Sequence, residues 1–373
     1  MTRLGSRLSY REAQEELALL WQVDISESSV RQITLRYGRV ADALIEAQVK
    51  EIEATAPGAT AKPHQLVMCT DGAMVQTTSG EWREVKTVSL GEFASRWDPK
   101  QARVVVETSA ISYFSRVEPA EAFSRSALLE WQRRGGDNAK KVVAVQDGAV
   151  WIQSFIDYHC PRATRVIDFA HALSYVATVG KAIYGPESVA FRQWYARQSR
   201  QLGRQPPQRT VNDLRLLQQL HPDHPEEETI ELAIRYLEKR LPMIDYPHFR
   251  HHQLPIGSGI VESGHKVVMQ RRMKQAGMRW AETNLNPMLA LRIALCNQRW
   301  SESWRAIVTH VHQESFPTFT PQPVAPTTAA NVITEAACQR LERTANRLAK
   351  RKQDPWRNNN WLFPKRHSPL HQN

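Results

Sequence analysis

The spacing of apolar residues predicts helices at the start of the chain. Over residues 8–48 apolar side chains recur every three or four positions, and a short polar turn divides them into two stretches. Ser28 or Ser29 is placed to cap the second stretch. Two helices joined by a tight turn are typical of a helix-turn-helix, so we expect residues 1–55 to form a helical segment of that kind.

The second of these helices would carry Arg31, Arg36 and Arg39 on its surface. Arginines in such a position suit contact with DNA phosphates. However, residues 1–60 hold seven Lys/Arg and nine Asp/Glu, a net charge of −2. Two interpretations stay open: a segment that contacts DNA, and an all-helical module that packs against the rest of the chain.

After a linker at residues 56–63 the apolar spacing becomes that of strands. HQLVMCTDG is a short apolar run, EWREVKTVSLGEF alternates as a half-buried strand does, and ARVVVETSAISYF follows, with turn residues Thr78–Gly80 between the first two. Helical patterns (EPAEAFSRSALLEWQRRG, GAVWIQSFIDYH, HALSYVATVGKAIYG) then alternate with the strand patterns KKVVAVQDG and ATRVIDF. Residues 64–185 therefore predict the order β-β-β-α-β-α-β-α, an α/β fold with a mixed sheet.

The remaining segments are predicted to be helical or extended. Residues 186–250 show only helical spacing and form a predicted α-helical insertion, and residues 251–314 return as the final helices of the core. Residues 315–373 begin with a Pro/Thr linker, and positions 339–373 carry nine Lys/Arg and two Asp/Glu. We expect this part to be a basic tail that attracts phosphates.

Composition narrows the class of partner. The chain has 373 residues and a formal net charge of +11, which favours a polyanion such as double-stranded DNA. Its four cysteines are far apart in sequence, so we expect reduced thiols rather than disulfides or a zinc ribbon. The amino terminus lacks the apolar core of a signal peptide and no segment has the length of a membrane span, which predicts a cytoplasmic protein without membrane contact.

Two aspartates occupy matching positions in the predicted sheet. Asp71 and Asp147 each follow an apolar strand and each precede Gly-Ala. An acid at the carboxyl end of a strand points into the crevice where α/β sheets bind ligands. A single Asp-Gly is usually only a turn, but two at comparable strand ends indicate a shared site.

A third acid stands in a basic surrounding. Glu262 lies in PIGSGIVESGHKVVMQRRMKQAGMRW, and residues 248–310 hold nine Lys/Arg against three Asp/Glu. Three converging carboxylates repel one another unless cations neutralise them, and oxygen ligands select Mg²⁺ or Mn²⁺. Two such ions can clamp the attacking and leaving oxygens of a phosphodiester. We expect the helix after Glu262 to hold the DNA strand through Arg271, Arg272, Lys274 and Arg279. A single face of a helix cannot carry all four, so some of them would serve other purposes.

Other candidate sites are weaker. The histidines around the third acid, including His265, show no zinc-ligand spacing. The GSG at positions 257–259 lacks the following Lys and Ser/Thr of a phosphate-binding loop, so no small-molecule nucleotide substrate is expected. Asp157 and Glu282 are not expected in the acid triad, because one falls within a helix and the other lies well beyond the glycine-bounded turn.

Four motifs carry a resemblance to a known family: CTDGAMV, VVAVQDGAVWI, RVIDFAHAL and IGSGIVESGHKVVMQRRMKQAGMRW. With the predicted strand order, they are similar to those of DDE transposases with an RNase H-like core. The pattern most resembles bacterial insertion-sequence transposases of the Kra type, in the Mutator-like superfamily, from the first helices to about Trp300. Members of this group often begin with a longer, cysteine-containing region, so a shorter form or a truncated copy is expected.

The resemblance implies a function and a set of site residues. Asp71, Asp147 and Glu262 would be the catalytic triad that binds two Mg²⁺ or Mn²⁺ ions. Asp168 and His171 match the D-x-x-H element that lies near the active site in Mutator-like enzymes; alternatively, His171 is a helix-start histidine hydrogen-bonded to Asp168. The partners would be the element ends and target DNA, with a homo-oligomer in the DNA complex.

Three functions remain as alternatives. The first is a transposase that cleaves at element ends and joins the freed 3′-hydroxyl to target DNA. The second is an RNase H-like nuclease or resolvase without strand transfer, and the third is a catalytically idle, transposon-derived DNA-binding protein.

Overall fold

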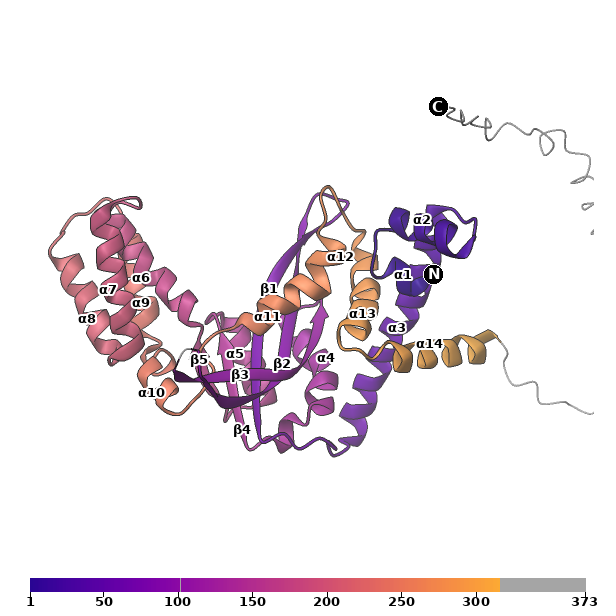
Figure 1. Ribbon diagram of the computed structural model, residues 1–373, viewed down its shortest axis with the longest axis horizontal. Helices are drawn as coiled ribbons and strands as arrows, with labels where there is room; N and C mark the ends of the chain where they lie inside the picture. Colours follow the sequence, from indigo (N-terminus) through magenta and orange to yellow (C-terminus); the bar gives the residue numbers. More distant parts are fainter. Residues whose placement is uncertain (101, 316–373) are drawn as a thin grey trace, which may run out of the picture. The chain divides into compact units, whose positions relative to one another are not determined.

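A five-stranded mixed sheet is the centre of the fold. The computed structural model describes residues 1–100 and 102–315, and Met1–Ser315 form one compact unit. The strand order is β3-β2-β1-β4-β5; β1, β2 and β3 pair antiparallel, whereas β4 and β5 run parallel to β1 (Figure 1). The strands are β1 Gln65–Gln76, β2 Trp82–Asp98, β3 Arg103–Arg116, β4 Lys141–Gln146 and β5 Thr164–Ile167. The predicted α/β class with a mixed sheet is confirmed.

Helices make up most of the remaining described chain. The α-helices are α1 Thr2–Gly5, α2 Tyr10–Trp21, α3 Glu27–Thr55, α4 Ala120–Arg133, α5 Val150–His159, α6 Phe169–Tyr184, α7 Val189–Arg204, α8 Pro207–Gln219, α9 Glu227–Glu238, α10 Tyr246–His251, α11 Gly259–Gly264, α12 Arg271–Met273, α13 Leu285–Cys296 and α14 Trp300–Ser315. A π-helix, His265–Gln270, joins α11 to α12, and short 3₁₀ turns lie at Gly136–Asn138, Leu241–Met243 and Glu282–Asn284.

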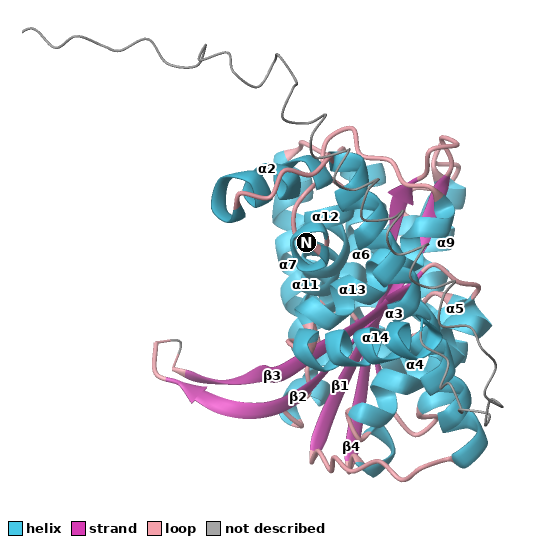
Figure 2. Cartoon of the chain, turned by 90° about the vertical axis from the view of Figure 1, so that its right-hand side faces the viewer, coloured by secondary structure: helices cyan, strands magenta, loops and turns pink. Residues whose placement is uncertain are grey.

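The sheet is covered on both faces, which explains why its inner strands read as continuous apolar runs. Because side chains alternate across a strand, Leu66 and Met68 face one cluster, with α4 and α5. Val67 and Cys69 face a second cluster, with α6 and the helices that follow it. The middle of β2 is buried on both sides, so its prediction as a half-buried strand was wrong there. Figure 2 shows β2 and β3 extending together beyond the other strands.

The amino-terminal segment contains three helices: the very short α1, then α2 and the long α3. Ser9 and Glu12 form a reciprocal capping box at α2. Ser26, and not the predicted Ser28 or Ser29, caps α3, which runs for 29 residues. One side of α3 contacts α13, α4 and α14, while Arg31 and Arg36 on its other sides are exposed. The segment thus has a packing role, and its arginines stay available for a partner.

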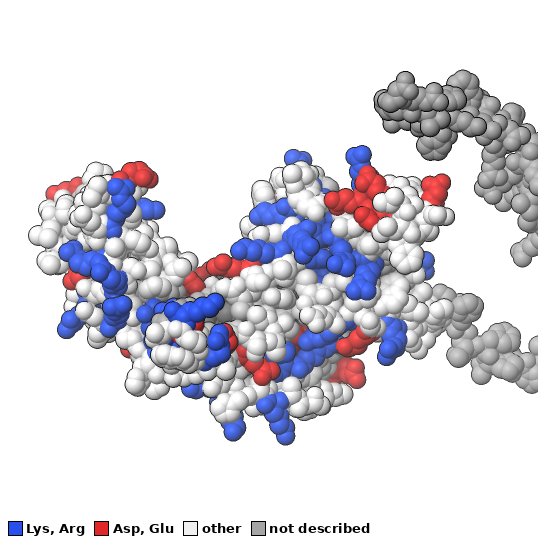
Figure 3. Space-filling model, in the orientation of Figure 1, with Lys and Arg blue, Asp and Glu red and all other residues white. Residues whose placement is uncertain are grey.

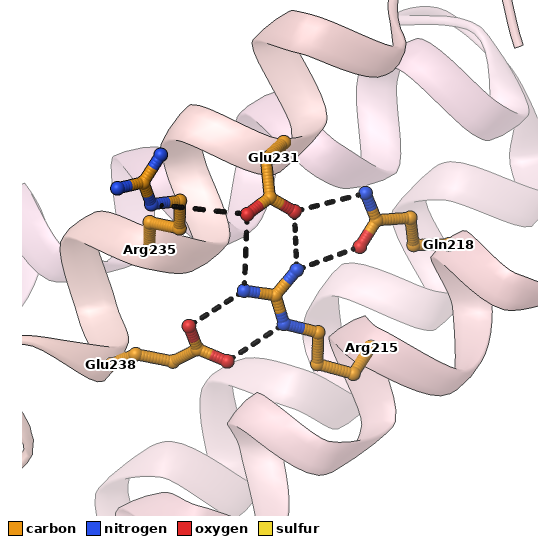
Figure 4. Close-up of polar contacts among 5 residues, drawn as sticks. All are labelled: Arg215, Gln218, Glu231, Arg235 and Glu238. Carbon is orange, nitrogen blue, oxygen red and sulfur yellow. Dashed lines mark hydrogen bonds and ion pairs between the residues drawn. The ribbon is translucent and has the colours of Figure 1, made fainter.

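Residues 186–250 contain helices and 3₁₀ turns within the described chain. Helices α7, α8 and α9 pack together and against α6 as a bundle (Figure 1). Arg215 of α8 holds α9 through Glu231 and through two hydrogen bonds to Glu238, at 2.7 and 2.6 Å (Figure 4). Gln218 and Arg235 complete this network, with contacts to Glu231 of 3.2 and 3.9 Å. The insertion therefore has its own apolar interior and its own polar fastening.

Two further expectations concern the cysteines and membrane-spanning helices. The described cysteines, Cys69, Cys160 and Cys296, are free thiols. Within the described residues, no helix has both the length and the hydrophobicity needed to cross a bilayer. The predicted basic tail in residues 315–373 lies, apart from Ser315, outside the described residues.

Candidate active site

The pairing of β1 with β4 places the first two acids side by side. The parallel register aligns Cys69 with Val145, and Asp71 and Asp147 each follow two positions later. Asp147 comes directly after β4 ends at Gln146, as predicted. Asp71, however, is not at a strand end: β1 continues and Asp71 pairs with Thr87 of β2. The first acid therefore sits on a rigid strand and the second on a turn.

Glu262 comes from the short helix α11, which lies against β2. The backbone of α11 comes close to the sheet at Gly264, where an added Cβ would lie 2.9 Å from Ser89 Oγ and from a Tyr113 ring carbon. Ser89 pairs with both Cys69 and Tyr113, so these three residues share one face of the sheet. That is also the face of Asp71, two positions after Cys69. A small residue at Gly264 thus lets α11 bring Glu262 to the face that carries the acids.

All five residues predicted at or near the site line one cavity of about 290 Å³: Asp71, Asp147, Glu262, Asp168 and His171. The acids arrive from three separate elements, β1, the β4–α5 turn and α11. In the space-filling view, acidic side chains lie beside α11 at the floor of a hollow, next to a group of Lys and Arg (Figure 3). The structure thereby brings together residues that are up to 191 positions apart in sequence.

Asp71 is the acid whose ionisation the surroundings oppose most clearly. Burial raises the pKa of the Asp71 carboxyl, and the nearby Asp147 and Glu84 add to that rise. The Gly72 amide, 2.8 Å from Oδ1, and His265 act in the opposite direction. The protein groups around Asp71 therefore only partly favour its charged form.

His265 is a site residue that sequence reasoning missed. Its Nδ1 lies 3.7 Å from Asp71 Oδ2. Burial lowers the pKa of the His265 imidazole, although Asp71 and Glu262 oppose that shift. The available signal was its position three residues after Glu262, one helical turn away on the same side. A search for zinc spacing alone could not reveal it.

Asp168 joins two distant segments at the edge of the cavity. Its Oδ1 accepts the His171 amide at 2.8 Å and so caps α6. Its Oδ2 accepts both the amide (2.7 Å) and the hydroxyl (3.0 Å) of Ser258, the residue before α11. The expected Asp168–His171 hydrogen bond exists through the His171 backbone, while the His171 ring packs edge-on against Tyr175 and Tyr236. Asp168 thus fixes the start of the helix that carries Glu262.

The predicted DNA-binding residues after Glu262 do not share one helix. Arg272 is fully buried, with its Nε 2.9 Å from the Gly5 carbonyl and its guanidinium over the rings of Tyr10 and Trp280. Its prediction as a DNA contact was wrong, because a charged residue in a sequence gives no sign of which side of a helix it takes. Arg271, Lys274 and Arg279 are exposed.

Arg271 belongs to a different basic group. With Arg3, Arg7 and Arg292 it lines a cavity of about 630 Å³ between the amino-terminal segment and α12–α13. Lys274 lies apart from this group, its ammonium 5.8 Å from the centre of the Trp82 ring. The exposed cations near the site thus come from several segments of the chain.

The two rejected acids have other partners. Asp157 forms an ion pair with Arg165, and Glu282 accepts Arg83 Nε at 2.8 Å. Neither lines the acid cavity. In the described part of the chain, no three His, Cys, Asp or Glu side chains already stand close enough to hold a metal ion.

Comparison with protein-family models and with curated proteins finds no match to this chain. The geometry of the acid cavity and the motifs around it therefore carry the functional proposal.

Proposed function

We propose that the protein is a DNA transposase that cleaves at the ends of a mobile element and transfers the freed strand to target DNA. The observation that carries the proposal is the meeting of Asp71, Asp147 and Glu262 in one cavity, although 115 positions separate the second acid from the third. Structural carboxylates are usually paired with cations. Three acids from three elements lining one cavity instead suit a phosphodiester-cleaving site.

The arrangement of strands supports an RNase H-like core. In the order β3-β2-β1-β4-β5, the central strand β1 has an antiparallel neighbour on one side and a parallel neighbour on the other. The second acid follows β4, as predicted, whereas the first lies within β1 and not after it. The helical bundle α7–α9 then enters between the second and third acids, within the insertion predicted for residues 186–250.

The donor set fits divalent cations. Asp71, Asp147 and Glu262 offer the oxygen ligands that Mg²⁺ and Mn²⁺ prefer. Burial raises the pKa of Asp71, and a bound cation would favour its charged form. Two bound ions would activate the attacking oxygen and stabilise the leaving oxygen of the phosphodiester. Of the protein's own groups, Asp168 orients α11, and the exposed arginines bind the DNA backbone.

The acids provide the first test. Asp71→Asn, Asp147→Asn and Glu262→Gln each remove one ligand charge with almost no change in shape. We expect each to lower cleavage by more than the about 10- to 100-fold that is typical of an outer-shell partner. Folding and DNA binding should persist, because neutralising one of several crowded carboxylates relieves repulsion.

The measurement is cleavage of DNA that flanks the protein's own gene, with Mg²⁺ or Mn²⁺ present, beside thermal unfolding of each variant. Asp157→Asn is the matched control, since Asp157 lies outside the cavity on α5. Wild-type-level cleavage by any triad variant would remove that residue from the active site.

The products separate the proposal from the two other functions. Element ends covalently joined to target DNA indicate a transposase, whereas cleavage without joined products indicates a nuclease or resolvase. DNA binding without cleavage by the wild-type chain would favour the idle DNA-binding protein, and the intact triad argues against that outcome.

A further inference from the structure

Two side chains of the helical insertion (residues 186–250) hold the turn that carries the second acid. The hydroxyl of Tyr236, in α9, donates a hydrogen bond to the backbone carbonyl of Asp147. Arg240, just after α9, donates from Nη2 to the carbonyl of Gly148 at 2.9 Å. Both contacts reach across about 90 positions of sequence, so they form only when the bundle is in place.

We call the two hydrogen bonds from Tyr236 and Arg240 the clamp, and ring contacts hold these two side chains in position. The Arg240 guanidinium lies 3.9 Å from the centre of the Tyr236 ring, and the Tyr175 ring stacks on the same ring at 3.7 Å with an interplanar angle of 7°. A ring stacked in this way has little freedom to move its hydroxyl.

The turn is built to accept this close approach. Gly148 has φ +87°, a conformation that other residues rarely adopt. A Cβ at this position would lie 2.5 Å from Tyr236 Oη and 2.6 Å from Arg240 Nε. The glycine that follows the second acid therefore serves contact with the insertion as well as the turn itself.

We propose that Tyr236 and Arg240 are positioning residues that hold Asp147 in place for metal binding, which makes the helical insertion part of the catalytic site. This inference rests on the proposed function. Asp147 follows the last residue of β4, and two local hydrogen bonds shape the turn: the Ala149 amide donates to Asp147 Oδ1 at 2.9 Å, and the Gly148 amide donates to Gln146 Oε1. Neither of these bonds holds the carbonyl oxygens of Asp147 and Gly148, which accept from Tyr236 and Arg240. Repulsion from Asp71 and Glu262 would push the Asp147 carboxylate outwards before a cation arrives, and the clamp resists that movement.

The proposal predicts a change in metal affinity rather than only in stability. Tyr236→Phe removes one hydroxyl and keeps the ring stack, so the fold should persist. We expect Mn²⁺ binding about 10-fold weaker than in the wild type, the size of effect seen when an outer-shell partner of a ligand is lost. Arg240→Ala should act in the same direction, and Tyr195→Phe, in α7 of the same bundle, should have no effect.

The experiment uses the full chain. Free Mn²⁺ is measured by electron paramagnetic resonance without DNA, and cleavage is measured across a Mn²⁺ titration. The proposal is supported if Tyr236→Phe binds Mn²⁺ more weakly and needs a higher Mn²⁺ concentration for cleavage. At high Mn²⁺ the cleavage rate of this variant should return to that of the wild type. Unchanged Mn²⁺ affinity would overturn the proposal, also when the variant is less stable, because the contact would then serve only to dock the bundle.

Different results would contradict the proposed transposase function and the proposed clamp. A wild-type chain that neither binds Mn²⁺ nor cleaves DNA would remove the proposed function and the clamp with it. A wild-type chain that does both, beside a Tyr236→Phe variant indistinguishable from it, would remove the clamp alone.

Discussion

At the scale of single residues, Asp168 shows how one carboxylate connects two elements beside the acid cavity. Its two oxygens accept three hydrogen bonds, one from the start of α6 and two from Ser258 at the start of α11. The sequence motif D-x-x-H indicated a position near the active site without a role. The hydrogen bonds of Asp168 indicate a structural role, because they tie the end of β5 to the start of α11, the helix of Glu262.

We predict that Asp168→Asn impairs cleavage with little loss of stability. Asn is as good a helix cap as Asp, so the His171 amide keeps its acceptor. The new amide group, however, turns a donor towards Ser258, whose backbone amide is also a donor. Cleavage should fall about 10- to 100-fold, and Ser258→Ala, which removes only the hydroxyl contact, should fall less. Cleavage rates and urea unfolding check this; an Asp168→Asn variant with full activity would refute it.

Residues that stand out by local pattern could be predicted as candidates, whereas contacts that depend on the tertiary structure could not. Asp71 and Asp147 can be recognised in the sequence because each begins an Asp-Gly-Ala tripeptide after an apolar run. Tyr236 and Arg240 carry no such mark, since their partners lie about 90 positions away in sequence. Arg272 shows the converse error: its charge suggested a surface, yet its guanidinium is buried against two aromatic rings.

At the scale of elements, the order of strands and helices follows from hydrophobic spacing, but their lengths do not. The β-β-β-α-β-α-β-α order predicted over residues 64–185 is the order observed. In contrast, the single helix expected after Glu262 is divided into α11, a π-helix and α12. Along that path Gly264 approaches Ser89 of β2 and Arg272 is buried, and both are tertiary contacts.

The Arg215 network gives a prediction for one element, α9. Arg215→Met keeps the aliphatic stem and removes five donors. We expect the free energy of unfolding to fall by about 1–2 kcal/mol at neutral pH, a modest value because the ion pairs are partly exposed. Since α9 carries Tyr236, Mn²⁺ affinity should fall as well. Arg192→Met, on the neighbouring α7, is the control.

The same network predicts a pH dependence. Hydrogen bonds from Arg215 hold the pKa values of Glu231 and Glu238 below their ordinary value of 4.5. A lowered carboxyl pKa adds stability that is complete above 4.5 and lost as pH falls through the folded-state values. The stability difference between wild type and Arg215→Met should therefore narrow on acidification below pH 4.5 in urea titrations. A difference that stays constant would mean that the network contributes by packing alone.

At the scale of the whole described unit, the acid site depends on long-range assembly. The sheet register brings Asp71 beside Asp147, whereas Glu262 arrives only after the chain has passed through the complete α7–α9 bundle. Hydrophobic spacing predicted that this bundle is helical. Its contact with the Asp147–Gly148 turn could not be predicted, because periodicity describes which side of a helix is apolar and not what the other side touches.

The last prediction concerns DNA binding by the basic cavity. Arg7 and Arg271, both exposed, come from α1–α2 and α12 and lie in one cavity with Arg3 and the buried Arg292. The double variant Arg7→Ala/Arg271→Ala should weaken DNA binding and lower the slope of log affinity against log salt by about two, one for each lost phosphate contact. Lys62→Ala/Lys140→Ala removes the same charge from two positions just before β1 and β4, at the ends of these strands that lie away from the acids. This variant therefore controls for net charge. An equal effect of both pairs would mean that DNA responds only to total charge, whereas a selective effect of the arginine pair would place the DNA backbone over this cavity.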